Sequence, residues 1–128
     1  ISKEGCLECI SGSHLSNILH KPKRFNGNDL YENDNSIEVP DINANRNDYK
    51  ILSWEIKAGD AIAFDFRTLH GASENVNKLN RRRIFSARVV GDDAFFVDRG
   101  GKGSPPFENI KLKTGDKLIG EEFPIIYQ

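Results

Sequence analysis

The chain has 128 residues, with 18 basic and 19 acidic side chains, a net charge of −1 and 38% hydrophobic residues. This near-neutral balance excludes a strongly basic nucleic-acid binder. No apolar run approaches the roughly 18 residues that a membrane helix needs, and no charged and then apolar leader resembles a signal peptide. The length is typical of one domain, and we expect residues 1–128 to form a single domain.

Two cysteines, Cys6 and Cys9, form a lone C-x-x-C motif. A structural zinc site needs four ligands, and the sequence has neither a second such motif nor a paired H-x-x-x-H. Residues 5–10 are typical of a strand, in which an offset of three places two side chains on opposite faces. We therefore expect two reduced thiols, which favours a reducing compartment and a cytoplasmic location.

Residues 15–50 show no clean period of two or 3.6 and are rich in asparagine and aspartate. These side chains satisfy neighbouring backbone groups, so they favour turns over strand ladders. A loop of this length in a compact domain is usually a lid, a binding loop or disordered. The segment is our best candidate for a lid, and a solvated excursion without a role is the alternative.

From residue 51 onward the hydrophobic pattern predicts several short strands. Residues 51–57 alternate apolar and polar side chains, and residues 61–70 do so again after a turn. Further strands are expected over 81–90 and 94–97, and no window shows helical periodicity. Short strands separated by turns predict an all-β sandwich or barrel.

His70 is the first candidate for a functional side chain. Period-two counting places it on the same face as Ile62, Phe64 and Phe66, so we expect it to point into the apolar interior at the end of a strand. An imidazole buried without partners is costly. Two interpretations stay open, namely a core histidine bonded to a backbone carbonyl and a metal ligand at a barrel mouth.

The second candidate feature is the triple arginine Arg81-Arg82-Arg83. Such a run is normally solvated, but at the start of a strand at least one of the three must face the interior. A buried guanidinium needs an anion, and its planar fork suits a carboxylate held by two hydrogen bonds. No acidic residue of the chain is an obvious partner, so a small-molecule carboxylate would fill this role.

Several stretches of the chain form a recognisable set of motifs, namely W-E-I-K-A-G-D-A-I-A-F at 54–64, H-G-A at 70–72, Asn75, R-R-I-F-S-A-R at 82–88, G-D-D at 91–93, and G-C-L-E at 5–8 with G-S-H at 12–14. Their most specific part is an H-G-A…N…R-R-x-x-S-x-R block. Together these stretches resemble the C-terminal half of the phytanoyl-CoA dioxygenase (PhyH)-like family, and the likeness is densest from residue 51 to residue 96.

This resemblance implies a double-stranded β-helix, a jelly-roll or cupin-like fold, and iron(II)- and 2-oxoglutarate-dependent oxygenase chemistry on a small organic substrate. His70 matches the second histidine of the family's iron site. Arg82 matches the arginine that grips the far carboxylate of 2-oxoglutarate, because it lies four residues before Ser86 as in the family's R-R-x-x-S phrase. Ser86 is assigned to the same co-substrate site, and Arg81 and Arg83 stay lesser candidates.

The sequence departs from the family at the first histidine and the acid, which come as H-x-D upstream of the G-S-H phrase. No H-x-D or H-x-E is present, since His14 and His20 are followed by other residues. We interpret these two histidines as structural or incidental. A facial triad needs two histidines and one carboxylate, so we expect an incomplete β-helix that belongs to a longer enzyme and is inactive alone.

Two alternatives come from other functional classes. The first is a cupin-like binding or isomerase barrel without oxygenase chemistry, in which His70 is structural or binds another metal. The second is a barrel fragment whose open strand edges seek partners, which would favour a homo-oligomer. In every case we expect a small molecule, rather than nucleic acid or a membrane, as the ligand.

Overall fold

The structure is a computed structural model that describes residues 1, 5–24, 26–32, 34–75, 82–101, 103 and 106–127. The described backbone is mostly non-helical. Its regular elements, in chain order, are β1 (Leu7–Ile10), the 3-10 helix η2 (Ser13–Leu15), the 3-10 helix η3 (Arg46–Asp48), β2 (Ile51–Ser53) and β3 (His70–Ala72).

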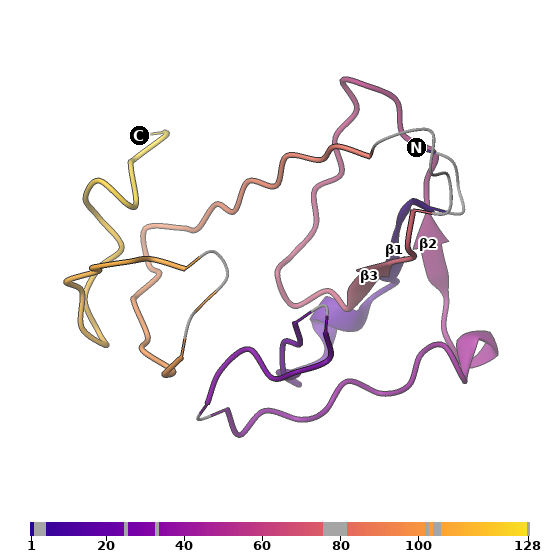
Figure 1. Ribbon diagram of the computed structural model, residues 1–128, viewed down its shortest axis with the longest axis horizontal. Helices are drawn as coiled ribbons and strands as arrows, with labels where there is room; N and C mark the ends of the chain where they lie inside the picture. The colour runs from indigo at the N-terminus through magenta and orange to yellow at the C-terminus, as the bar shows by residue number, and fades with distance from the viewer. Residues whose placement is uncertain are drawn as a thin grey trace. The chain divides into compact units, whose positions relative to one another are not determined.

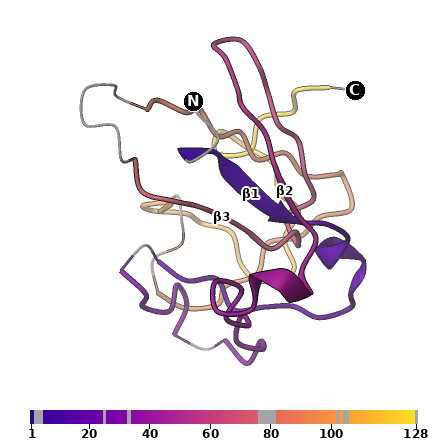
Figure 2. The same ribbon diagram turned by 90° about the vertical axis from the view of Figure 1, so that its right-hand side faces the viewer.

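The three strands form one antiparallel sheet in the order β2-β1-β3, with β1 in the centre (Figures 1 and 2). Cys9 of β1 lies opposite Leu52 of β2 and His70 of β3. Two backbone hydrogen bonds extend the pairing beyond the strands, from Ile10 N to Leu69 O and from Ser11 N to Lys50 O, each 2.9 Å. The described strands therefore confirm the expected β character, and they form one small sheet rather than the two sheets of a β-helix.

Two of the predicted strands are present but shorter than expected. The strand predicted over residues 5–10 is present as β1, which begins two residues late at Leu7, and the one over 51–57 is present as β2, which begins at Ile51 as predicted. β2 ends at Ser53, four residues early. Edge strands need a partner along their whole length to form a ladder, and β1 offers one only to the three residues of β2.

The predicted strand over 61–70 is wrong, because a turn interrupts it. Asp65 Oδ1 accepts a hydrogen bond from Arg67 N at 2.8 Å, and Asp65 O accepts one from Thr68 N at 2.9 Å. An aspartate that bonds the backbone two residues ahead stabilises a turn over a strand. Regular pairing starts only at His70, so β3 occupies 70–72.

The strand predicted over 81–90 forms no ladder in its described part, residues 82–90, and Arg81 lies outside the described residues. Its apolar side chains are largely exposed, with Phe85 at 91%. Over 94–97 the structure has a single bridge, between Phe95 and Lys117. β-propensity extends the backbone, but a strand also needs a neighbour with which to exchange hydrogen bonds.

The chain divides into two compact units. The first comprises Ile1–His20 and Ile37–Phe85 and contains the sheet. The second comprises Lys21–Ser36 and Ser86–Gln128, where Phe96 N donates to Asp116 O at 2.8 Å and the rings of Phe107 and Phe123 lie 5.1 Å apart. The expected loop over 15–50 therefore contributes to both units.

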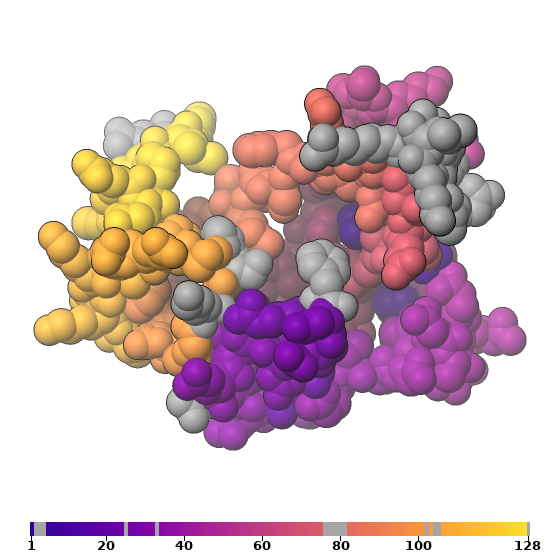
Figure 3. All heavy atoms as spheres, viewed as in Figure 1, coloured from indigo at the N-terminus to yellow at the C-terminus, as the bar shows by residue number. Residues whose placement is uncertain are grey.

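The core of the first unit is small. Among the described residues only Gly5, Cys6, Cys9 and Thr68 are buried, and both cysteines are free thiols, as expected. On the face shown in Figure 3, only small areas of the indigo segment that contains β1 are visible. Within the described ranges, no helix has the length and apolar character to cross a membrane.

Candidate functional site

His70 is the first residue of β3 and is exposed. The expectation that it points into a buried interior is therefore wrong. The physical reason is the turn at Asp65, which breaks the continuous alternation from Ile62 onward on which that expectation rested. One part of the expectation survives, because the Phe64 ring lies 4.8 Å from the His70 ring at a tilt of 56°.

The imidazole of His70 is oriented by a backbone carbonyl. Its Nδ1 lies 2.8 Å from Thr68 O, and Thr68 is buried. A carbonyl oxygen can only accept a hydrogen bond, so Nδ1 carries the proton in the neutral ring. The lone pair is then on Nε2. A histidine that donates one ring N–H to a backbone carbonyl and offers the other nitrogen is the arrangement found at metal sites.

Arg82 is half-buried and joins two segments of the first unit. Its Nη1 donates to Gly5 O at 2.5 Å and to Ser73 O at 3.3 Å. The first carbonyl precedes β1 and the second follows β3. The guanidinium thus binds two carbonyls, where the sequence predicted a carboxylate. Both hydrogen bonds that Arg82 makes to described residues come from Nη1. Its Nε–Nη2 edge therefore keeps the fork geometry that suits a carboxylate.

The structure brings His70 and Arg82 to the same pair of strands. His70 lies opposite Cys9, whereas Arg82 contacts Gly5, four residues earlier along the chain. Four residues of extended backbone span about 13 Å, so the two candidates lie toward opposite ends of the β1–β3 pair. Of the other candidates, Arg83 is exposed, and Ser86 is exposed and belongs to the second unit.

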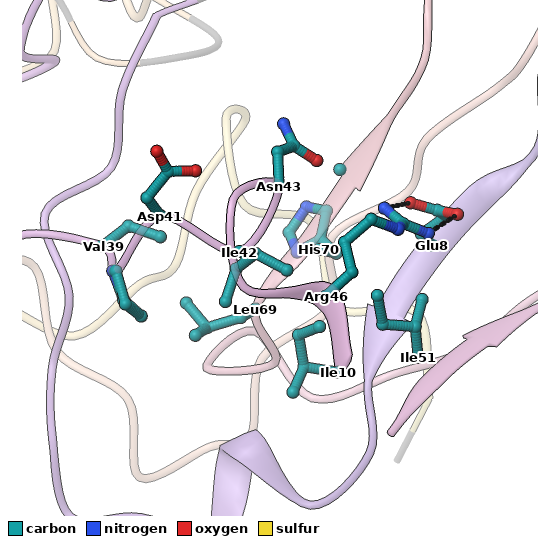
Figure 4. Close-up of a pocket in the computed structure, with 12 residues that line it drawn as sticks. Glu8, Ile10, Val39, Asp41, Ile42, Asn43, Arg46, Ile51, Leu69 and His70 are labelled. Carbon is teal, nitrogen blue, oxygen red and sulfur yellow. Dashed lines mark hydrogen bonds and ion pairs between the residues drawn. The ribbon is translucent and has the colours of Figure 1, made fainter. Parts of the chain in front are cut away.

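A cavity of about 300 Å³ lies beside the sheet in the first unit (Figure 4). His70 borders it, and Arg82 is not among its lining residues. Its rim carries an ion pair that joins β1 to η3, with Arg46 Nη2 and Nη1 donating to the two carboxylate oxygens of Glu8 at 2.8 and 3.0 Å. This hydrogen-bonded guanidinium lowers the pKa of Glu8.

Sequence reasoning missed Glu8 and Arg46 as neighbours. They lie 38 residues apart, in a short strand and in a segment without periodicity. A bond between such positions depends on how the segment after Ile37 folds back over β1. The only local signal was the position of Glu8 next to the buried Cys9 in a strand. Neighbouring side chains of a strand point to opposite faces, so Glu8 is on the face that Cys9 does not occupy.

The remaining histidines lie apart from His70. His14 is part of η2, and His20 has its Nδ1 3.1 Å from Glu38 O. Within the described part of the chain, no three histidine, cysteine, aspartate or glutamate side chains gather closely enough to hold a metal ion. The described residues therefore offer one oriented imidazole, not a complete metal site.

Comparison with known families gives one match. A family model described as phytanoyl-CoA dioxygenase (PhyH) matches residues 2–84. Searches of curated proteins and of solved structures find no match. The matched region includes the whole sheet, His70 and Arg82. Because it covers more than half of the 128 residues, the chain belongs to the phytanoyl-CoA dioxygenase family.

Proposed function

We propose that the chain is part of an iron(II)- and 2-oxoglutarate-dependent dioxygenase that hydroxylates a small organic substrate on a double-stranded β-helix. Family membership supports the reaction class. The single observation that carries the proposal is the orientation of His70. Its Nδ1–H donates to Thr68 O, which leaves Nε2 available as a metal ligand.

In this proposal His70 holds iron and Arg82 positions 2-oxoglutarate. When bound, the metal and co-substrate together supply the oxidising chemistry. Arg82 contributes its Nε–Nη2 edge, which can hold one carboxylate of the co-substrate through two parallel hydrogen bonds.

The donor set was tested against the needs of iron. A facial triad takes two histidines and a carboxylate, and the described residues bring one such donor into position. These residues alone do not fit a complete iron site. The proposal therefore places the other two ligands outside the described residues and assigns to this chain only the second histidine and the co-substrate arginine.

The co-substrate role is tested by ligand-observed NMR of 2-oxoglutarate in the presence of the purified chain. We expect saturation transfer to 2-oxoglutarate from the wild type and from Arg83→Lys, and its loss in Arg82→Lys. Lysine keeps the positive charge but loses the fork, so this pair of variants isolates the bidentate geometry. A backbone amide spectrum of each variant establishes that it is folded.

Equal transfer from Arg82→Lys and Arg83→Lys would overturn the assignment of Arg82. Absence of transfer from the folded wild type would favour the alternative of a cupin-like barrel without oxygenase chemistry. In that alternative, Arg82 serves only to connect the Gly5 and Ser73 carbonyls.

A further inference from the structure

The cavity beside the sheet lies on the face of β1 that carries Glu8 and Ile10. Successive side chains of a strand point to opposite faces, so Cys9 between them points away from the cavity. Ile51 lies opposite Ile10 in the register and therefore shares this face. The sheet thus supplies one wall of the cavity.

The facing wall is the segment 39–46, which precedes and enters η3 (Figure 4). Asp41 stabilises the fold of this segment through two hydrogen bonds to residues within it. Its Oδ1 accepts from Ala44 N at 3.0 Å, and its backbone carbonyl accepts from Asn45 Nδ2 at 2.9 Å. The Glu8–Arg46 ion pair then fastens the segment to β1. The wall is therefore preformed, which lowers the entropic cost of binding.

The lining favours an aliphatic ligand with a positive charge. Five of its twelve lining residues have branched apolar side chains, namely Ile10, Val39, Ile42, Ile51 and Leu69. Arg46 is neutralised by Glu8. Asp41 forms no ion pair within the described residues, so its carboxylate is the unmatched charge of the lining. An anionic ligand would be repelled by this charge, whereas an ammonium group would be attracted.

We propose that this cavity is a binding site for a small aliphatic amine, with the hydrocarbon part against Ile10, Ile42 and Ile51 and the ammonium group at Asp41. Its volume falls at the lower end of the range for small-molecule sites, and apolar and polar residues line it in similar numbers. The Glu8–Arg46 pair fixes the position of one wall relative to the other. The inference does not rest on the proposed oxygenase chemistry, because binding of the amine requires neither iron nor 2-oxoglutarate, although His70 borders the cavity.

The test is titration of the metal-free chain with cyclohexylamine, followed by backbone amide NMR. We expect shifts confined to residues 8–10, 39–46, 51 and 69–71, weaker shifts with cyclohexanol, and none with cyclohexanecarboxylate. Ile42→Trp should abolish binding because the indole fills the cavity, whereas Ile18→Trp, at an exposed position outside the cavity, should bind like the wild type. The titration contains neither iron(II) nor 2-oxoglutarate, so its outcome does not depend on the proposed metal site.

The role of the ion pair is tested with matched arginine variants. Arg46→Gln should weaken binding of cyclohexylamine, and Arg67→Gln should not, although it also removes an exposed arginine–carboxylate pair. Exchange of the two charges in a Glu8→Arg, Arg46→Glu double variant should restore binding. Tighter binding of the carboxylate than of the amine would overturn the proposal. So would shifts spread outside the cavity, or equal binding by Ile42→Trp and Ile18→Trp.

Discussion

Replacing Arg82 by alanine should destabilise the first unit. The guanidinium donates to Gly5 O and Ser73 O, which lie on the segments before β1 and after β3. A hydrogen bond from a charged donor contributes about 1.5–3 kcal/mol when buried. The bond to Gly5 O is partly buried, whereas the one to Ser73 O is exposed and counts for less. We therefore expect a loss of about 2 kcal/mol in the free energy of unfolding.

Urea unfolding followed by fluorescence measures this loss, because the single tryptophan, Trp54, directly follows β2. Arg83→Ala is the matched control. Its side chain is exposed, and such substitutions usually change stability by less than about 0.5 kcal/mol. An equal loss of unfolding free energy in Arg83→Ala and Arg82→Ala would refute this expectation. So would an Arg82→Ala variant that unfolds at the same urea concentration as the wild type.

Three further predictions follow from named groups. The pKa of Glu8 is lowered, so its stabilising pair with Arg46 is present above pH 4.5 and is lost as pH falls through the lowered value. The protection of amides 39–46 against exchange, relative to their intrinsic rates at each pH, should therefore fall in acid in the wild type, and Glu8→Gln should show no such fall. Burial raises the pKa of Cys9 above its ordinary 9.0, so its alkylation by iodoacetamide at pH 8 should be slower than that of free cysteine. The stability due to this neutral thiol should be present below pH 9 and fall as pH rises through the raised value; Cys9→Ala should lack that fall. Finally, the chain alone, given iron(II) and 2-oxoglutarate anaerobically and then air, should form no succinate, and succinate that disappears in His70→Ala would contradict this.

The sequence allowed the end of β1 and the start of β2 to be predicted, because strand-forming residues and the turn residues beside them are read directly from the chain. It did not predict the order β2-β1-β3, which depends on pairing between residues more than 40 positions apart. The turn at Asp65 was missed although aspartate is a turn former. The apolar alternation on both sides of it gave the stronger signal.

The sequence allowed the residues of the candidate site to be predicted, but not their exposure or their hydrogen-bond partners. The H-G-A and R-R-x-x-S phrases single out His70 and Arg82 through resemblance. The exposure of His70 and the carbonyl partners of Arg82 follow from tertiary contacts that no local pattern contains. The tautomer of His70 likewise depends on where the Thr68 carbonyl points after the turn, and the cavity depends on the contact between Glu8 and Arg46.

The central claim is that His70 presents Nε2 as a metal ligand, and paramagnetic broadening of the histidine ring signals by Mn²⁺ tests it most directly. His14 and His20 are internal controls in the same sample. The proposed role predicts that the His70 ring signals broaden at the lowest Mn²⁺ concentration, with a nitrogen spectrum that shows the proton on Nδ1. Earlier broadening at His14 or His20, or a proton on Nε2 of His70, would contradict it.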